Sequence, residues 1–240
     1  MSPMPPGSPV MVVTGSSRGI GRGMAEHFAN AEYIVEGCSR GESTLTDVPN
    51  YHHSTVDVSD ESQVRDWARA VKRRQGRVDV AICNVGLVKL GTVTGMTTLE
   101  SFRSFVDAIL TSTFLVCREF SKVMALQRYG RIINISSIMT ELHAPGTPAY
   151  SSAKSGVVEL TKVLARELIN TGVTCNVVSP SLVLTESSEA FGEEWKKNML
   201  AMQTLQRPIE IAELCNIVRF FASPESGCVS GQVVHTCLVT

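Results

Sequence analysis

The sequence lacks an excess of either charge, long apolar runs and paired cysteine motifs. Its 22 basic residues are balanced by 23 acidic ones, which argues against a protein that coats nucleic-acid phosphates with a basic face. No apolar run approaches the roughly 18–20 residues needed to cross a bilayer, so we predict no membrane partner. None of the seven cysteines forms a C-x-x-C pair, and their odd number predicts reduced thiols in a cytoplasmic protein without a metal site.

The sequence also lacks a signal peptide and any sign of a domain boundary. Residues 1–9 contain neither a positively charged nor an apolar segment, so we predict a flexible N-terminal tail. Single α/β domains run to about 250 residues, so the remaining chain, 10–240, is expected to form one domain. Composition therefore predicts an ordinary globular protein whose core needs no disulfide.

Runs rich in Val and Ile predict seven strands with helical segments between them. The runs are Val10–Thr14, Tyr33–Cys38, His53–Val58, Val78–Cys83, Arg131–Ser136, Val173–Val178 and Gln232–Leu238. They are mostly continuous rather than alternating, which is typical of strands covered on both faces. Intervening segments place apolar residues at helical spacing, as Val64, Trp67, Ala68 and Val71 do. We predict an α/β fold, a single doubly wound Rossmann domain with a seven-stranded parallel sheet and helices on both faces.

Thr97-Thr98-Leu99-Glu100 matches the pattern of a capping box, with Met96 available as a hydrophobic staple. A helix is therefore expected to begin at about this point.

A glycine-rich turn follows the first predicted strand and opens a helix. It reads Thr14-Gly15-Ser16-Ser17-Arg18-Gly19-Ile20-Gly21. Gly15 allows a tight turn, Gly19 allows the backbone to approach a phosphate, and Gly21 allows close packing of the helix on the sheet. A turn with no ligand is the alternative. The strand before it and the helix after it favour a pyrophosphate site at the helix N-terminus.

Further motifs follow in order, and together they resemble the short-chain dehydrogenase/reductase family. They are the G-x-x-x-G-x-G spacing of the turn, Asp57-Val58, Cys83-Asn84-Val85-Gly86, Ser137 with Tyr150-x-x-x-Lys154, and Pro180-Ser181-Leu182-Val183-Leu184-Thr185. The resemblance covers the chain from Val10 to about Val239. Over that length it is greatest to 3-oxoacyl-(acyl-carrier-protein) reductases.

The resemblance implies a catalytic set of Ser137, Tyr150 and Lys154. An isolated Tyr-x-x-x-Lys pair would be better explained as a tyrosine stacked on a lysine stem. Here, by the family pattern, Tyr150 transfers a proton to or from the substrate oxygen while Ser137 hydrogen-bonds that oxygen. We expect Lys154 and the positive nicotinamide to lower the pKa of Tyr150. The alternative for Ser137 is a strand-end hydroxyl that caps a turn, which is the role expected of its neighbour Ser136.

The resemblance also implies a nicotinamide cofactor, with 17 residues expected to bind it. They are Gly15, Ser17, Arg18, Gly19, Ile20, Gly21, Ser39, Arg40, Asp57, Val58, Asn84, Gly86, Tyr150, Lys154, Pro180, Val183 and Thr185.

The end of the second strand predicts NADP(H) rather than NAD(H). NAD-dependent relatives carry an acidic residue there, whereas this chain has Ser39 followed by Arg40, with Arg18 nearby in the turn. Two arginines can hold a 2′-phosphate with charge-assisted hydrogen bonds. We expect Glu36 to point away from the ribose.

Three positions depart from the family pattern. Ile109 occupies the place of an Asn in a water-linked proton relay, and isoleucine offers only main-chain groups for that role. Ser181 replaces the usual Gly after Pro180, and the chain ends Thr236-Cys237-Leu238-Val239-Thr240 where many relatives have Asp-Gly-Gly. These departures leave open whether turnover is impaired.

The segment from about 186 to 207 lies where the family has a substrate lid. Phe191, Trp195 and Met199 either line an acyl pocket there or only pack on their own domain. Met139, Leu142 and His143 are further expected pocket residues. Arg128 matches one carrier-docking arginine, but Thr171 stands where a second is expected.

The predicted function is NADPH-dependent reduction of a ketone or 3-oxoacyl thioester to an alcohol. The resemblance implies a homo-oligomer, a tetramer or dimer, formed through the helices near Leu99–Arg128 and Ser151–Asn170. Two alternatives remain open. One is a cofactor-binding protein with little or no turnover, and the other is an enzyme of the same fold that catalyses dehydration or isomerisation without net redox change.

Overall fold

The computed structural model describes residues 7–31, 33–87, 91–189 and 191–239. Residues 1–6 of the predicted N-terminal tail lie outside the described residues. Pro9, by contrast, is buried, and its carbonyl oxygen accepts a 2.9 Å hydrogen bond from the Ile34 amide. The folded part of the chain therefore begins before Val10.

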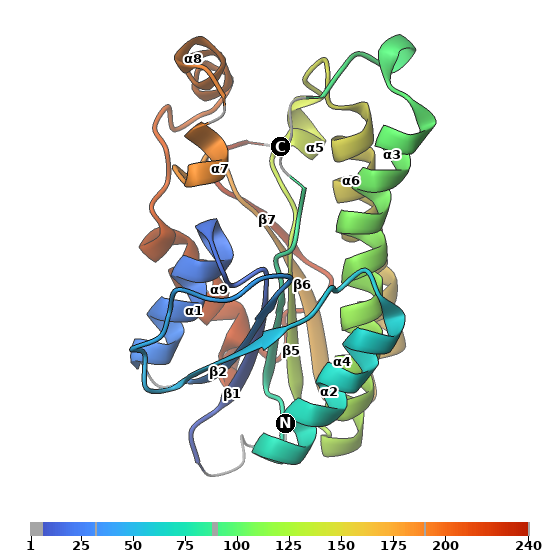
Figure 1. Cartoon of the computed structure of the whole chain (residues 1–240), viewed down its shortest axis with the longest axis vertical. Helices are drawn as coiled ribbons and strands as arrows, with labels where there is room; N and C mark the ends of the chain where they lie inside the picture. The colour runs from blue at the N-terminus through green and yellow to red at the C-terminus, as the bar shows by residue number, and fades with distance from the viewer. Residues whose placement is uncertain (1–6, 32, 88–90, 190, 240) are drawn as a thin grey trace.

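Seven parallel strands form one sheet in the order β3-β2-β1-β4-β5-β6-β7 (Figure 1). The strands are β1 (Val10–Thr14), β2 (Ile34–Ser39), β3 (Tyr51–Thr55), β4 (Val80–Cys83), β5 (Gly130–Ile135), β6 (Val173–Ser179) and β7 (Val233–His235). The predicted doubly wound sheet is confirmed. The strand order reverses between β1 and β4, and ligands of such sheets bind beyond the carboxyl ends of the strands at this switch point.

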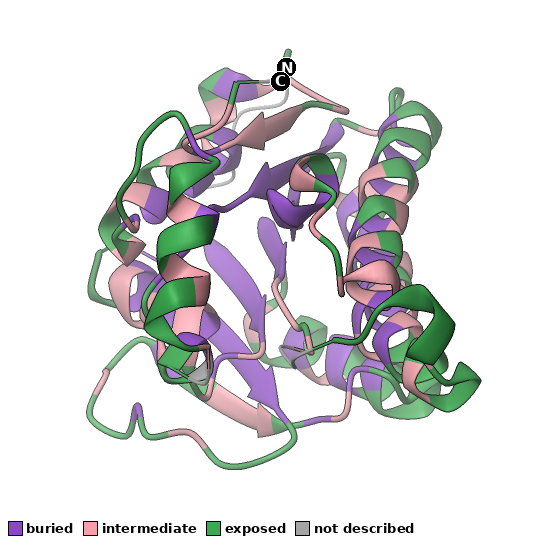
Figure 2. Ribbon diagram, turned by 90° about the horizontal axis from the view of Figure 1, so that it is seen from above, coloured by how far each residue is buried: buried purple, intermediate pink, exposed green. Residues whose placement is uncertain are grey.

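Helices cover both faces of the sheet (Figures 1 and 2). One face carries α1 (Gly19–Ala31) and α9 (Ile211–Ala222), and the other carries α2 (Glu61–Gln75), α4 (Ser112–Gln127) and α6 (Pro148–Glu167). Shorter helices lie in the connections, namely α3 (Leu99–Phe105), α5 (Met139–Leu142), α7 (Glu186–Glu189) and α8 (Glu193–Ala201). Each face packs through its own apolar layer. Figure 2, seen from above, shows that the central strands between the helices are buried.

The helix α2 illustrates how the sequence sets these layers. Val64, Trp67, Ala68 and Val71 are buried as predicted, with the Trp67 ring edge-on to Phe120 of α4. Asp60 caps the helix start, accepting hydrogen bonds from the amides of the second and third helical residues. Burial of this apolar stripe, rather than helix propensity, fixes α2 against the sheet.

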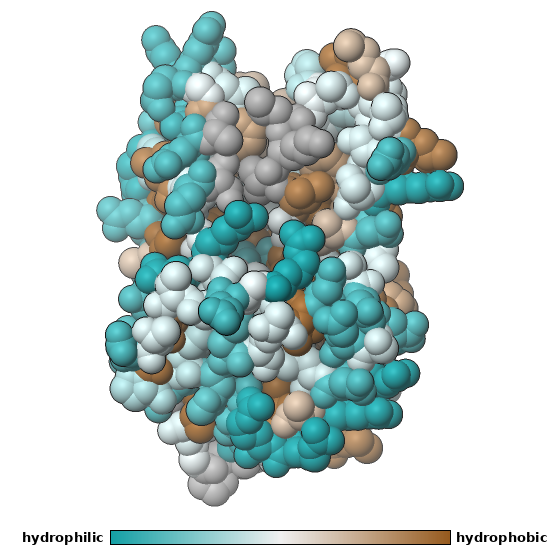
Figure 3. All heavy atoms as spheres, in the orientation of Figure 1, coloured by the Kyte–Doolittle hydropathy of each residue, from teal (hydrophilic) through white to brown (hydrophobic). Residues whose placement is uncertain are grey.

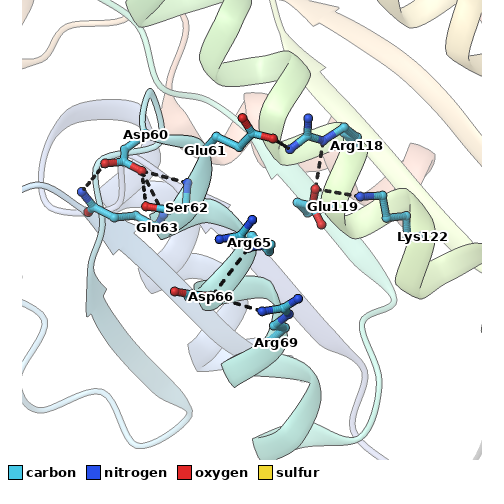
Figure 4. A network of polar contacts seen from close by, with 10 residues as sticks. All are labelled: Asp60, Glu61, Ser62, Gln63, Arg65, Asp66, Arg69, Arg118, Glu119 and Lys122. Atoms are coloured by element: carbon cyan, nitrogen blue, oxygen red, sulfur yellow. Dashed lines mark hydrogen bonds and ion pairs between the residues drawn. The ribbon is translucent and has the colours of Figure 1, made fainter.

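Charged side chains join α2 to α4 outside this apolar layer (Figure 4). Arg118 of α4 bonds Glu61 at 2.8 Å and Glu119 at 2.9 Å, and Lys122 bonds Glu119 at 2.8 Å. The two helices are thus also paired at the surface.

The C-terminal end of α2 explains the basic run that follows Val71. Lys72, Arg73 and Arg74 occupy its last turn, where cations complement the helix dipole. Arg74 and Gln75 also bond the fully buried carboxylate of Glu36 at 2.5 and 2.7 Å. Glu36 is therefore held at the C-terminal end of α2.

Thr14 joins the two strands at the switch point. Its hydroxyl accepts hydrogen bonds from the Asn84 amide at 2.9 Å and the Val85 amide at 3.2 Å. The Asn84 side chain in turn donates to the Thr14 carbonyl oxygen at 3.1 Å. The carboxyl ends of β1 and β4 are thus fixed to one another.

Two local predictions were wrong. The third strand is Tyr51–Thr55 rather than His53–Val58, so Asp57 lies two residues beyond the strand. The expected capping box is replaced by Thr98 alone, whose hydroxyl accepts from the Ser101 amide at 3.1 Å. Met96 is 72% exposed in a 3₁₀ turn, because the helix starts one residue later than the pattern indicated and Met96 has nothing to pack on.

Candidate active site

The glycine-rich turn has the close packing expected of a phosphate cradle. Gly15 and Gly19 adopt positive φ angles of 71° and 56°, which side-chain-bearing residues rarely accept. A Cβ at Gly21 would lie 2.2 Å from the Gly15 carbonyl oxygen and 2.5 Å from Asn84 Nδ2. Gly21 therefore lets α1, which starts at Gly19, pack directly against the turn and against Asn84. A pyrophosphate fits this arrangement.

Side chains from two other loops, those after β4 and β6, lie beside this turn. A Cβ built on Gly19 would lie 3.7 Å from Thr185, which places the loop after β6 against the turn. Gly86 lies beside Lys154, since its added Cβ would be 3.6 Å from Nζ. The structure therefore brings together Gly15, Gly19, Gly21, Asn84 and Thr185, and places Gly86 beside Lys154.

The predicted arginines lie at the exposed edge of the site. Arg18 and Arg40 are exposed, and neither makes a side-chain hydrogen bond or ion pair with any other residue that the structure describes. Ser39 is nearly buried and donates a 2.7 Å hydrogen bond to the Gly41 carbonyl oxygen. Both guanidinium groups are thus available to an anion.

Asp57 and Val58 follow β3 and differ in which of their atoms a ligand could reach. The Asp57 carboxylate accepts from the Ser59 hydroxyl at 2.6 Å and its amide at 2.9 Å, and these bonds lower its pKa despite partial desolvation, with Arg40 contributing. The Val58 side chain lies in the apolar layer with Trp67. A ligand could reach only the main chain of Val58, whereas Asp57 is ionised and ready to accept.

Ser137, Tyr150 and Lys154 converge at the carboxyl end of β5. Tyr150 and Lys154 lie in the first turns of α6. The Ser137 hydroxyl accepts a 3.3 Å hydrogen bond from the Met139 amide and lies near enough to the Tyr150 phenol to affect its pKa. Lys154 is buried, and its ammonium donates a 2.7 Å hydrogen bond to the Ile135 carbonyl oxygen. Ser136, by contrast, donates to the Lys154 carbonyl oxygen at 3.2 Å and faces away from Tyr150.

Burial controls the pKa values of this group. It raises the pKa of the Tyr150 phenol, which the nearby Ser137 hydroxyl opposes, and it lowers the pKa of Lys154 to about 8. The expected lowering of the Tyr150 pKa by Lys154 was wrong. The ammonium is bonded to a strand carbonyl, and desolvation of the phenol outweighs the effect of Ser137. Tyr150 is therefore protonated at neutral pH and can donate.

Ile109 lies within a π-helical turn, Val106–Thr111, between α3 and α4. Its side chain is fully buried against Phe105, Ala149 and Ala153. Its carbonyl oxygen accepts hydrogen bonds from the hydroxyls of Thr113 at 2.7 Å and Ser112 at 3.2 Å. The main-chain acceptor expected at this position thus already has two partners within α4.

Ser181, the second departure, fastens the loop after β6 to the segment that follows α8. Its hydroxyl donates to Gln203 Oε1, and Gln203 Nε2 donates to the Met199 carbonyl oxygen at 3.2 Å. Ser181 and Gln203 are 6% and 4% exposed, so water does not compete for these bonds. The Cβ that replaces the usual glycine therefore has a structural purpose.

An apolar cluster connects the predicted lid to Tyr150. Met199 of α8 packs with Ile138 and Met139, and Leu142, Tyr150 and Trp195 pack at its margin. Phe191 stacks on Trp195 with centroids 4.3 Å apart. In the view of Figure 3 the upper rim is notched between the ends that carry α8 and α3. Met139, Leu142, Trp195 and Met199 thus lie together near Tyr150, whereas His143, also expected to line the pocket, is exposed and outside the cluster.

Sequence reasoning missed Gln203, and also Tyr51 and His53, which hold the loop that carries Arg40. Only Gly37 gave a signal for the last two, since a glycine within a buried strand indicates a close approach by other atoms.

No cluster of three or more metal-ligating side chains occurs among the described residues. Within the same residues no helix has the length and apolarity to span a membrane.

Comparisons with known proteins agree with this geometry. A family model described as enoyl-(acyl carrier protein) reductase matches residues 15–237. The 3-oxoacyl-(acyl-carrier-protein) reductase FabG of Haemophilus influenzae is 30% identical over 231 residues, covering 94% of this chain and 95% of that protein. FabG of Staphylococcus aureus is 31% identical, covering 93% and 94%.

Two solved structures share the fold over nearly the whole chain. A crystal structure of a putative gluconate dehydrogenase from Agrobacterium tumefaciens has a TM-score of 0.89 at 27% identity, covering 96% of this chain and 95% of that one. Levodione reductase has the same TM-score at 24% identity, with 96% of both chains covered.

Proposed function

The chain belongs to the short-chain dehydrogenase/reductase family, and we propose that it reduces a carbonyl group to an alcohol with NADPH as the hydride donor. The observation that carries the proposal is the convergence of Ser137, Tyr150 and Lys154 at the carboxyl end of β5, where the Lys154 ammonium donates to the Ile135 carbonyl oxygen beside Gly86. The relatives that are named 3-oxoacyl-(acyl-carrier-protein) reductases support the reaction type.

The residues present fit the chemistry of carbonyl reduction. The bound nicotinamide would supply the hydride. Tyr150, kept protonated by burial, donates its proton to the oxygen as negative charge develops on it. Ser137 holds the same oxygen by a hydrogen bond, and Lys154 lies one helical turn beyond Tyr150.

NADPH is favoured over NADH by the charges at the end of β2. Arg18 and Arg40 are exposed without ion-pair partners in the described chain, while Glu36 is committed to Arg74 and Gln75. A 2′-phosphate would gain charge-assisted hydrogen bonds at this point. Titration should show at least about tenfold tighter binding of NADPH, equivalent to about 1.4 kcal/mol. Arg40→Asp should shrink that ratio, and equal affinities in the wild type would refute the assignment.

The substrate class we propose is a ketone or 3-oxoacyl thioester with an apolar chain. Residues 186–207 serve as the lid, and its Trp195 and Met199 with Met139 and Leu142 would contact the chain. Arg128, which ends α4 with a φ of 58°, would be one contact for a carrier protein.

A set of three variants tests the chemistry. On an active substrate, Tyr150→Phe should reduce turnover by roughly 10²–10⁴-fold, the usual range for a positioned acid. Ser137→Ala should also impair turnover, whereas Ser136→Ala should change stability more than rate, because its hydroxyl bonds only the Lys154 carbonyl oxygen.

NADPH oxidation over ketones and 3-oxoacyl thioesters is the assay. Product analysis without added NADPH separates reduction from dehydration or isomerisation. Unchanged turnover in Tyr150→Phe would contradict the mechanism, and no turnover on any carbonyl would favour the non-catalytic alternative.

We also propose a homo-oligomer, a tetramer or dimer. Large apolar side chains are exposed on α4 and α6, with Phe114 43% and Val163 53% exposed, and Leu126 is 88% exposed at the end of α4. Such exposed side chains are consistent with a contact between copies. Light scattering on the purified protein distinguishes a monomer from a dimer or tetramer.

A further inference from the structure

A chain of hydrogen bonds links the glycine-rich turn to the loop that carries Arg40. Ser16 Oγ lies 2.8 Å from the Tyr51 hydroxyl, which lies 2.7 Å from His53 Nδ1. His53 Nε2 lies 2.8 Å from the Gly41 carbonyl oxygen. Three segments that are distant in sequence, the turn after β1, the strand β3 and the loop after β2, therefore share one polar network.

The Gly41 carbonyl oxygen, at the far end of the network, determines which atoms donate and which accept. A carbonyl oxygen can only accept, so Nε2 of His53 carries the hydrogen and donates it to Gly41. With a neutral ring, Nδ1 accepts from the Tyr51 hydroxyl, which in turn accepts from Ser16. Burial raises the pKa of Tyr51, which keeps this hydroxyl protonated and able to donate.

Gly37 shows that the sheet makes room for this contact. A Cβ at this position of β2 would lie 2.4 Å from Ser16 Oγ and 2.5 Å from the Tyr51 hydroxyl oxygen. A side chain at Gly37 would therefore displace either Ser16 or Tyr51. The network passes through a space that only glycine leaves open.

The far end of the network holds the loop at Gly41, where His53 bonds the carbonyl oxygen. Further along the loop, the Ser43 hydroxyl accepts from the Leu45 amide at 3.1 Å. Ser39 contributes through its bond to Gly41 and lies 3.2 Å from His53 Nε2. Arg40 lies between these anchored residues with a free guanidinium.

We propose that Tyr51 and His53 are positioning residues for cofactor selectivity, holding the Ser39–Leu45 loop so that Arg40 meets the ribose 2′ substituent. The inference rests on the proposed use of a nicotinamide cofactor. Neither side chain needs to touch the ligand. They act through the Gly41 carbonyl oxygen, and so discriminate between cofactors by fixing Arg40.

Two variants of His53 separate this role from general structural damage. In His53→Gln the side-chain amide reaches the position of Nε2 and can still donate to Gly41. In His53→Asn the shorter amide reaches only the position of Nδ1, so the bond to Tyr51 is kept and the bond to Gly41 is lost. His52→Asn is the matched control, since His52 is the exposed neighbour on the opposite face of β3.

Calorimetric titration with adenosine 2′,5′-bisphosphate and with 5′-AMP measures the contribution of the 2′-phosphate without turnover. His53→Asn should reduce the affinity ratio by roughly fivefold, the value of about one net hydrogen bond, and leave 5′-AMP binding nearly unchanged. His53→Gln and His52→Asn should keep the wild-type ratio. A folded His53→Asn protein with an unchanged ratio would overturn the proposal.

Hydrogen exchange of the amides in residues 39–45 tests the positioning role of His53 independently of the NADPH proposal. If the wild type binds both nucleotides equally, the assignment of NADPH fails. The positioning role then stands only if exchange in this loop is faster in His53→Asn than in His53→Gln. Equal exchange in the two variants would overturn it.

Discussion

Both the side chain and the carbonyl oxygen of Ile109 make contacts other than those expected for a proton relay at this position. The side chain fills an apolar cluster between the π-helical turn and α6, and the carbonyl oxygen accepts from Thr113 and Ser112. An ordered water there would need two to four polar partners, and isoleucine adds none. Under the proposed mechanism, a proton route from Lys154 to solvent would therefore be slow or would use another group.

Replacing Ile109 with Asn tests this residue directly. The amide would be buried among Phe105, Ala149 and Ala153, so we expect a loss of about 1–3 kcal/mol in the free energy of unfolding from unmet hydrogen bonds. Urea unfolding measures it. Ile109→Val is the control and should cost about 0.5–1.5 kcal/mol.

If reprotonation of Tyr150 limits the rate, Ile109→Asn should raise kcat even though it lowers stability. The solvent isotope effect should then be smaller in the variant than in the wild type. A well-folded Asn variant with unchanged kcat and isotope effect would show that Ile109 does not limit proton transfer.

The Ser181–Gln203 bond fastens the segment just after α8, within the proposed lid. In Ser181→Ala the Gln203 amide oxygen loses its buried donor, so we expect the last turn of α8 to open more often. Exchange of the Gln203 and Thr204 amides, which donate to Leu200 and Cys237 at 3.0 and 2.9 Å, should accelerate by roughly tenfold.

Ser188→Ala is the matched control for the lid, because that hydroxyl bonds only within its own turn at Thr185. Amides of α9 should be unaffected in both variants. Identical exchange at Gln203 in Ser181→Ala and the wild type would mean that other contacts hold the lid.

The buried strands could be predicted from sequence because they are continuous apolar runs. The edge strand β3 could not be placed correctly, since its residues are Tyr51, two histidines, Ser54 and Thr55, and only Tyr51 is buried. The apolar Val56 and Val58 just beyond it shifted the prediction forward. These two valines are buried, but they lie in the connection between β3 and α2 and not in a strand.

The parts of the candidate site that consist of short sequence motifs could be predicted. The parts formed by contacts between residues distant in sequence could not. The glycine-rich turn and the Tyr150–Lys154 spacing are local, so the sequence alone indicated them. The Ser181–Gln203 bond and the Ser16–Tyr51–His53 network join residues with no periodic relation. Only the folded chain shows that these side chains meet.

At the scale of the whole molecule, Lys154 makes stability depend on pH. Burial lowers its pKa from 10.5 to about 8, so between these values the unfolded chain binds more protons than the folded one. The free energy of unfolding should therefore rise with pH from about 8, by up to about 3 kcal/mol over the full interval. Tyr150 has a raised pKa and acts in the opposite direction above pH 10, so pH 8–10 is the informative range.

Urea unfolding of the wild type and Lys154→Met at several pH values in that range isolates this contribution, because all other titrating groups are common to both proteins. The stability difference between the two should move in favour of the wild type as pH rises. A difference that is constant with pH would show that Lys154 keeps its ordinary pKa in the folded protein.

The bonds between Thr14 and the end of β4 have a kinetic consequence. They join residues 70 positions apart, so β1 cannot complete its contacts until the chain through α2 and β4 has docked. Contacts between residues so distant in sequence form slowly, because the entropy of closing the intervening loop is lost first. We therefore expect nucleotide-binding competence to arise late during refolding, after most helical signal has returned, so that ligand binding reports the completion of the native sheet.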